Sequence, residues 1–371
     1  MSNPSCLYIH IPFCSGKCRY CDFYSILYSP KLSVSYIDAL KKQIEGLRAR
    51  FSTVYIGGGT PTVLDIKTLE SLLKSVQSLL NKGYELTIEA NPDTLDREKA
   101  SLLLERGVNR ISIGIQSFND KILKTLGRRH SVRSCLKAID NIHQAGFENI
   151  SIDLMFGTPG QKINDIKNNI KVLENIPVNH ISWYSLGYEE GTKIYCDLKK
   201  NLIKPLEDSI VSEMYLCIIE SLRRMGFKQY EISNFARDGF KCRHNETYWM
   251  NEEYIGLGAS AVSYINGVRS RNISEVSGYI DCVNSGEQVT VFSENLSPIE
   301  KAKETAALKI RTMDGIEKIW FKQKTGFDFE ELEFDSINGL IQGGLISLKD
   351  NRIFLTPKGI LFCDTVSSAF L

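Results

Sequence analysis

The chain has 371 residues, with 45 Lys and Arg against 44 Asp and Glu. A formal net charge of +1 provides no overall field that would recruit nucleic acid or an anionic membrane, so we expect no nucleic-acid partner. The N-terminus has no basic stretch followed by a long apolar run, and no segment approaches the roughly 18 apolar residues of a membrane span. We expect a soluble cytoplasmic protein, and leave a peripheral membrane contact and a homodimer open.

Short β-branched runs alternate with apolar stripes at helical spacing up to about residue 190. Strands are predicted at 7–13, 52–58, 85–90, 110–116, 150–156 and 180–186. Helical stripes are predicted at 34–47, at 69–80 with Gly83 as C-cap, at 132–142 ahead of Gly146, and near 208–225. This alternation implies right-handed crossovers and a parallel sheet. Six units are too few for a closed eight-unit barrel, which leaves an open partial barrel or a doubly wound sheet.

The remaining third of the chain does not continue this alternation of strand and helix patterns. Aromatic residues, Asn and Gly dominate from about residue 230, and helical periodicity is weak there. After residue 297 short helical patterns surround a strand-turn-strand pattern, which predicts a small α+β domain. We therefore expect a first domain over residues 1–235, an aromatic connecting segment over 236–296 and a C-terminal domain over 297–371.

Three of the ten cysteines, Cys14, Cys18 and Cys21, lie within eight residues, while the other seven are scattered. This spacing argues against a disulfide framework and favours a reducing compartment. A redox dithiol of Cys18 and Cys21 would normally lie at the start of a helix. Aromatic residues follow Cys21 instead, which argues against a redox dithiol. Three unrelated buried cysteines are the least favoured interpretation, because free cysteines rarely cluster at ligand spacing.

Two kinds of metal site remain for these thiols. A zinc site would need a fourth ligand, for which His10, Cys242 and His244 are available. Alternatively, C-x3-C-x2-C in one loop can hold three irons of a [4Fe–4S] cluster and leave the fourth iron open. The amine and carboxylate of S-adenosylmethionine could chelate that iron, and a reduced cluster could then cleave its sulfonium.

Polar residues and glycines collect where the predicted strands end. The second strand ends in a glycine triplet and Thr60, the third in Glu89, the fourth in Gln116 and Ser117, and the fifth contains Asp153. Each of these could separately be a helix cap or a turn residue. Their coincidence at successive strand ends predicts a shared pocket.

The cysteine spacing, with Tyr20 just before the last cysteine, resembles the radical S-adenosylmethionine superfamily. The resemblance implies an α/β fold, a partial (βα)6 radical SAM barrel with a small α+β C-terminal domain. The [4Fe–4S] cluster, held by Cys14, Cys18 and Cys21, would lie with S-adenosylmethionine at the C-terminal mouth of the strands.

Six motifs, YIHIPFC, GGGTPT, EANP, GIQSF, LGRRH and DLMFGTPGQ, together look like the oxygen-independent coproporphyrinogen III oxidases and their relatives. Matched motif by motif, this resemblance implies that S-adenosylmethionine contacts Tyr8, Gly58, Thr60, Glu89, Gln116, Arg128 and Asp153. It assigns no catalytic residue.

Two features separate the branches of this family. The decarboxylating oxidases resemble a pattern with a further cysteine two positions after the last cluster ligand, where this chain has Phe23. They also resemble a pattern with an N-terminal extension ahead of the first strand, whereas we expect the first strand here to start at residue 7. The HemW-type heme chaperones look similar to this chain in both respects and share its H-N-x-x-Y-W stretch, which begins at His244. A neutral imidazole can ligate heme iron, so His244 is the candidate heme ligand, with an ordinary loop hydrogen bond as the alternative.

The resemblance therefore implies a heme chaperone that binds heme and delivers it to an unidentified acceptor hemoprotein. The alternative is an oxygen-independent coproporphyrinogen III oxidase that forms protoporphyrinogen IX by radical decarboxylation. Whether the protein is an enzyme thus stays open at this point.

Overall fold

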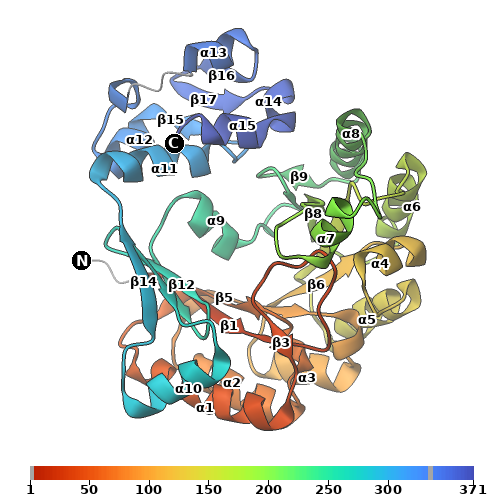
Figure 1. Cartoon of the computed structure of the whole chain (residues 1–371), viewed down its shortest axis with the longest axis vertical. Coiled ribbons are helices and arrows are strands. Elements are labelled where there is room, and N and C mark those ends of the chain that lie inside the picture. The colour runs from red at the N-terminus through yellow and green to blue at the C-terminus, as the bar shows by residue number, and fades with distance from the viewer. Residues whose placement is uncertain (1–3, 333–336) are drawn as a thin grey trace.

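The computed structural model describes residues 4–332 and 337–371. Its main feature is a curved 12-stranded sheet whose six central strands run parallel and in chain order. They are β1 (Cys6–Ile11), β4 (Phe51–Gly58), β5 (Leu80–Ala90), β6 (Arg110–Gln116), β7 (Ile150–Phe156) and β8 (His180–Ser185). The six predicted strands and the open partial barrel are confirmed (Figure 1).

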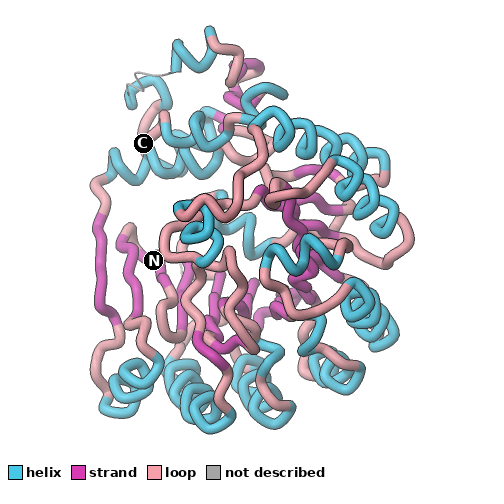
Figure 2. Tube along the Cα trace, turned by 45° about the vertical axis from the view of Figure 1, so that its right-hand side comes forward, coloured by secondary structure: helices cyan, strands magenta, loops and turns pink. Residues whose placement is uncertain are grey.

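Helices cover the outer face of this sheet, as Figures 1 and 2 show. They are α1 (Pro30–Gly46), α2 (Ile66–Gln77), α3 (Arg97–Glu105), α4 (Asp120–Leu126), α5 (Val132–Ala145), α6 (Ile163–Leu173) and α8 (Asp208–Arg224). The short α7 (Lys193–Lys199) lies beyond the end of β8, where its Asp197 pairs with Arg19 (Figure 1). Two 3-10 turns, Pro61–Val63 and Pro92–Thr94, follow β4 and β5. Most residues of the predicted stripes lie on the buried faces of α1, α2, α5 and α8, because each helix removes one apolar side from water. Val34, Leu136 and Ile210 of these stripes are exposed instead.

One predicted helix end is wrong. Gly146 caps α5 in the left-handed conformation, with φ of 103°. In contrast, α2 ends at Gln77, and Gly83 lies inside β5 with φ of 71°. Leu79 and Leu80 continue the helical spacing by coincidence, because they lead into the strand that follows.

The barrel sheet is extended at both edges, by residues 228–236 at one and by residues of the predicted connecting segment 236–296 at the other. Antiparallel β10 (Asn234–Ala236) and β9 (Lys228–Gln229) follow β8 at one edge. At the other edge β11 (Tyr254–Leu257) runs parallel to β1, and antiparallel β12 (Val262–Ile265), β13 (Val268–Asn272) and β14 (Thr290–Asn295) follow. The helices α9 (Arg243–Trp249) and α10 (Val276–Ser285) lie in the same segment.

The C-terminal part is a small α+β unit with its own apolar core, which includes Ile310, Phe321 and Val366. A three-stranded sheet of β15 (Ile316–Glu317), β17 (Arg352–Leu355) and β16 (Ile346–Lys349) lies among its helices. These helices are α11 (Pro298–Lys309), α12 (Lys318–Thr325), a 3-10 turn (Phe329–Leu332), α13 (Ile337–Gln342), α14 (Pro357–Leu361) and α15 (Cys363–Ser368). Within the described residues, no helix is long and apolar enough to cross a membrane.

Candidate functional site

The interior of the barrel contains a cavity of about 400 Å³. Inward-facing side chains of β5, β6, β7 and β8 line it, and residues 20–23 of the cysteine loop lie at its mouth. Strand ends and loop meet here because all six parallel strands point their C-terminal ends the same way. The shared pocket expected from the strand ends is therefore present.

The cysteine loop is held at both ends by a short parallel pair of strands, β2 (Phe13–Cys14) and β3 (Ile26–Leu27). Cys14, Cys18 and Cys21 are all half-buried. Burial raises the pKa of Cys14, and that of Cys21 to about 11, while the nearby Cys18 thiolate adds a smaller increase to each. Arg128 Nη1 donates to Cys18 Sγ at 3.3 Å, so a positive group already faces this sulfur.

The arrangement of these thiols suits a cluster better than a single ion. Among residues 4–332 and 337–371, no three His, Cys, Asp or Glu side chains converge on one metal position. A [4Fe–4S] cube needs each thiolate to reach a different iron, so its sulfurs need not converge. Three thiols in one half-buried loop with a neighbouring guanidinium therefore fit the cube.

Contacts to neighbouring elements hold the cysteine loop in place. Arg19 pairs with Asp197 of α7, and its backbone N–H donates to Leu126 O at the end of α4 at 3.1 Å. Arg129 Nη1 donates to Ser15 O at 2.6 Å. The loop is thus fixed above the cavity by two arginines that do not line the cavity themselves.

The glycine segment after β4 brings its backbone close to several groups. A Cβ on Gly58, whose φ is 106°, would lie 2.5 Å from the His10 ring. A Cβ on Gly59 would lie 2.7 Å from Phe13 O, which is backbone and cannot turn aside. Only glycine therefore lets this segment pass under the cysteine loop.

Two carboxylates face the cavity from neighbouring parts of the barrel. Glu89 accepts from Tyr55 Oη at 2.8 Å and from Gly58 N at 3.1 Å. Burial, with the negative charge of Asp153, raises the pKa of Glu89 to about 7. Asp153 accepts from Ser112 Oγ at 3.1 Å, and burial raises its pKa to about 6. A cationic ligand beside them would stabilise both ionised forms.

Gln116 and Arg128 complete the upper part of the cavity. Gln116 has φ of 67°, which is unusual for a residue with a side chain and directs it inward at a break in the pairing of β6 with β7. Arg128 Nη2 donates to Asn91 Oδ1 at 2.5 Å and to Gly114 O at 2.6 Å. Arg128 therefore joins the cysteine loop to the strand ends.

Five of the seven residues expected to contact S-adenosylmethionine line the cavity: Gly58, Glu89, Gln116, Arg128 and Asp153. Tyr8 and Thr60 do not. The Tyr8 hydroxyl lies 3.0 Å from His10 Nδ1, and Thr60 Oγ1 accepts from Asn91 Nδ2 at 2.9 Å. These two residues therefore support other side chains beside the cavity.

His244, the candidate heme ligand, is buried and does not line the cavity. It is 1% exposed, whereas its neighbour Asn245 lines the cavity. Its Nδ1 lies 3.1 Å from Cys6 Sγ and 3.2 Å from Thr53 Oγ1, and its Nε2 lies 2.9 Å from Tyr248 Oη. Both ring nitrogens thus have protein partners, which fits the alternative of an ordinary hydrogen-bonded histidine, and heme ligation by His244 stays a prediction.

Replacing His244 with Ala is expected to lower the free energy of unfolding by about 2–3 kcal/mol, because a buried ring is lost and Thr53 and Tyr248 lose a partner. Urea unfolding would measure this change. If His244 is an ordinary hydrogen-bonded residue, the hemin affinity of the folded variant should equal that of the wild type. A selective loss of hemin binding with unchanged stability would identify His244 as the ligand.

Sequence reasoning missed the lower half of the cavity. Arg110, Ser112, Ser151, His180 and Ser182 line it from the first halves of their strands. Strands of a parallel sheet are usually apolar on both faces. In 110–116 and 180–184, however, every second residue is polar or glycine, and this alternation indicates a polar face on the inside of the barrel. Attention to strand ends alone overlooked this face.

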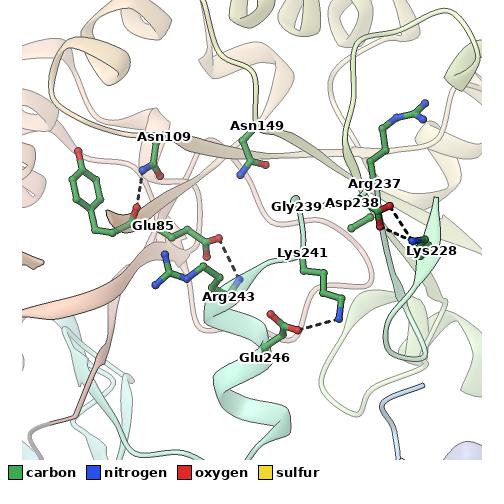
Figure 3. Close-up of a pocket in the computed structure, with 12 residues that line it drawn as sticks. Glu85, Asn109, Asn149, Lys228, Arg237, Asp238, Gly239, Lys241, Arg243 and Glu246 are labelled. Carbon is green, nitrogen blue, oxygen red and sulfur yellow. Dashed lines mark hydrogen bonds and ion pairs between the residues drawn. The ribbon is translucent and has the colours of Figure 1, made fainter. Parts of the chain in front are cut away.

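A second cavity of about 470 Å³ lies near the N-terminal ends of β5 and β6 (Figure 3). Its charged groups already have protein partners, since Lys228 pairs with Asp238 and Lys241 with Glu246. Glu85 accepts from the backbone N–H of Arg243 at 3.2 Å. This cavity lacks the cysteine loop, so we do not assign the main site to it.

Comparison with known proteins agrees with this architecture. Residues 8–173 match the radical SAM superfamily and residues 296–362 the HemN C-terminal domain. The chain is 36% identical to the heme chaperone HemW of Bacillus subtilis over 98% of both chains. It is 35% identical to that of Lactococcus lactis over 100% of this chain and 98% of the relative.

The fold is shared with a solved structure, the radical SAM enzyme coproporphyrinogen III oxidase (HemN) from Escherichia coli. The TM-score is 0.86 with 22% identity, over 99% of this chain and 90% of the other. Similarity to HemW proteins over almost the whole length is more specific than this shared fold. The chain belongs to the HemW family, within the radical S-adenosylmethionine superfamily.

Proposed function

We propose that this protein is a heme chaperone, which binds heme and passes it to an acceptor hemoprotein. The observation that supports this most directly is the similarity to heme chaperones over 98% or more of the chain. Phe23 agrees with it, because a phenylalanine stands where the decarboxylating oxidases are expected to have a cysteine.

In this proposal Cys14, Cys18 and Cys21 hold a [4Fe–4S] cluster, and the upper cavity holds S-adenosylmethionine. Glu89 and Asp153 supply negative charge for its cationic groups, while Arg128 and the glycine segment position it. The cluster, when bound and reduced, supplies an electron to the sulfonium. The protein supplies binding, orientation and exclusion of water.

Heme is too wide to enter a cavity of about 400 Å³ that also holds S-adenosylmethionine, so we place heme at the mouth of the cavity. Phe23 lines this mouth and is 64% exposed, which provides an apolar face for a porphyrin.

The experiment is a hemin titration of anaerobically purified, cluster-reconstituted protein, followed on the same sample by an anoxic assay with coproporphyrinogen and S-adenosylmethionine. A saturable Soret band without decarboxylated product supports the chaperone. Turnover to protoporphyrinogen without tight hemin binding would identify the oxidase instead.

Changing Phe23 to Ala is expected to weaken hemin binding roughly tenfold, because the ring no longer covers apolar porphyrin surface. The matched control is Phe292→Ala, since Phe292 is 46% exposed on the edge strand β14, away from the mouth. Equal hemin affinities for the two variants would contradict the placement of heme beside Phe23, without touching the chaperone proposal itself.

A further inference from the structure

The cavity continues below the two carboxylates to the floor of the barrel. Arg110 and Gln116 stand at opposite ends of β6, about 20 Å apart at the usual rise of a strand, and both line the same cavity. On β6 and β7 several of the side chains between them are small, as at Ser112, Gly114 and Ser151, while the larger Tyr55 and His180 line the cavity from β4 and β8. The small side chains of β6 and β7 leave the floor connected to the mouth.

Arg110 is a buried charge without an ionic partner. It is 1% exposed, and its Nη1 donates to Asn149 Oδ1 at 2.9 Å and to Phe240 O at 3.0 Å. Among the described residues the guanidinium makes no ion pair, and the residue lines the cavity. An unpaired buried charge is costly, so an anion beside it would be strongly favoured.

Two protein carboxylates, Glu85 and Asp153, interact with Arg110 through their charge, and neither forms an ion pair with it. Burial lowers the pKa of Arg110, while the nearby Cys242 and then Glu85 raise it by their charge, so the net shift is upward. The two oxygens of Glu85 accept from the backbone N–H groups of His244 at 3.1 Å and of Arg243 at 3.2 Å. Glu85 thus orients the start of α9 and leaves the guanidinium facing the cavity.

Two neutral polar groups lie near this charge with unused hydrogen-bonding capacity. Asn245 lines the cavity, and its side-chain amide has no partner in the described part of the chain. Thr87 is fully buried, its Oγ1 has no partner there either, and alternation along β5 places it on the inward face between Glu85 and Glu89. The floor therefore combines a cation with a free amide donor, and the free hydroxyl of Thr87 lies behind them, opposite Arg110 in the pairing of β5 with β6.

We propose that the floor of the barrel binds the carboxylate of a small organic acid, with Arg110 as the ionic partner and the Asn245 amide as a second donor. A guanidinium with an adjacent amide matches the two oxygens of a carboxylate. A single positive charge balances one carboxylate, whereas a phosphate dianion would remain half-compensated. This site is separate from that of S-adenosylmethionine and does not depend on heme binding.

The test uses the anaerobically purified full-length protein with acetate and propionate as probes, at constant ionic strength with chloride as the exchanged anion. Calorimetric titration and thermal unfolding should show saturable binding by the wild type. Asn245→Ala and Arg110→Lys should bind at least about tenfold more weakly. Asn81→Ala, which removes a half-buried Asn on the outer part of β5, should bind like the wild type.

Absence of saturable binding to the wild type would overturn the proposal, because the floor would then hold only water. Equal binding by wild type and Asn245→Ala would also overturn it, because the anion would then occupy another site such as the surroundings of Arg128. If Arg110→Lys fails to fold, the comparison of Asn245→Ala with Asn81→Ala decides.

Discussion

Replacing Cys18 with Ala is expected to abolish assembly of the [4Fe–4S] cluster. Two remaining thiolates cannot hold the three irons that a C-x3-C-x2-C loop ligates. Cys18 is the middle cysteine of the loop and the one that faces the Arg128 guanidinium at 3.3 Å. Iron and sulfide content after anaerobic reconstitution, with the visible absorption of the cluster, measures the loss.

The matched control for this variant is Cys282→Ala, because Cys282 is also half-buried but lies on α10, outside the cysteine loop. Cys282→Ala should assemble a complete cluster. A Cys18→Ala protein with the iron content of the wild type would show that the ligand assignment is wrong and would reopen the zinc and dithiol interpretations.

The affinity for S-adenosylmethionine should rise as pH increases from 6 to 8. The pKa of Glu89 is raised to about 7 and that of Asp153 to about 6, so both become ionised across this window. Ionised carboxylates attract the cationic ligand and protonated ones do not. As the pair is coupled, we expect roughly a tenfold change in affinity over the window, measured by anaerobic calorimetry on cluster-loaded protein.

The stability of the unliganded protein should have the opposite dependence. Both carboxyl groups have pKa values above those of the unfolded chain, so their protonated forms favour the folded state at low pH. This contribution is lost as pH rises through 6 and 7. Glu89→Gln, which stays neutral, should reduce both dependences, whereas Glu98→Gln on the exposed surface of α3 should reduce neither. An unchanged pH profile in Glu89→Gln would exclude Glu89 as the titrating group.

The elements that the sequence predicted well are those whose local pattern matches their tertiary environment. Apolar residues at helical spacing define α5, and Gly146 ends it in a left-handed conformation that glycine adopts readily. Gly83 was misassigned because two leucines after α2 continue the helical spacing while already leading into β5. Such coincidences are resolved only by strand pairing, which depends on residues far away in the chain.

In the site too, some features follow from the local sequence and others depend on residues far away in the chain. Spacing alone identified the cysteine loop, since its three thiols lie within one loop whose chemistry depends on local sequence. Strand ends correctly indicated Glu89 and Asp153, because parallel strands end on one side of a barrel. His244 could not be judged this way, because its partners Cys6 and Thr53 come from the beginning of the chain.

By itself, the sequence determined the order of strands and helices, the cysteine loop and the family, since each depends on local spacing or on motifs. Only the tertiary structure decided which of those motif residues face the cavity. In the folded chain His244 is buried, whereas its neighbour Asn245 lines the cavity. Arg110 is buried at the floor of the cavity without an ionic partner. The physical reason is that side-chain direction and burial follow from the packing of α9 against distant strands, which no local pattern encodes.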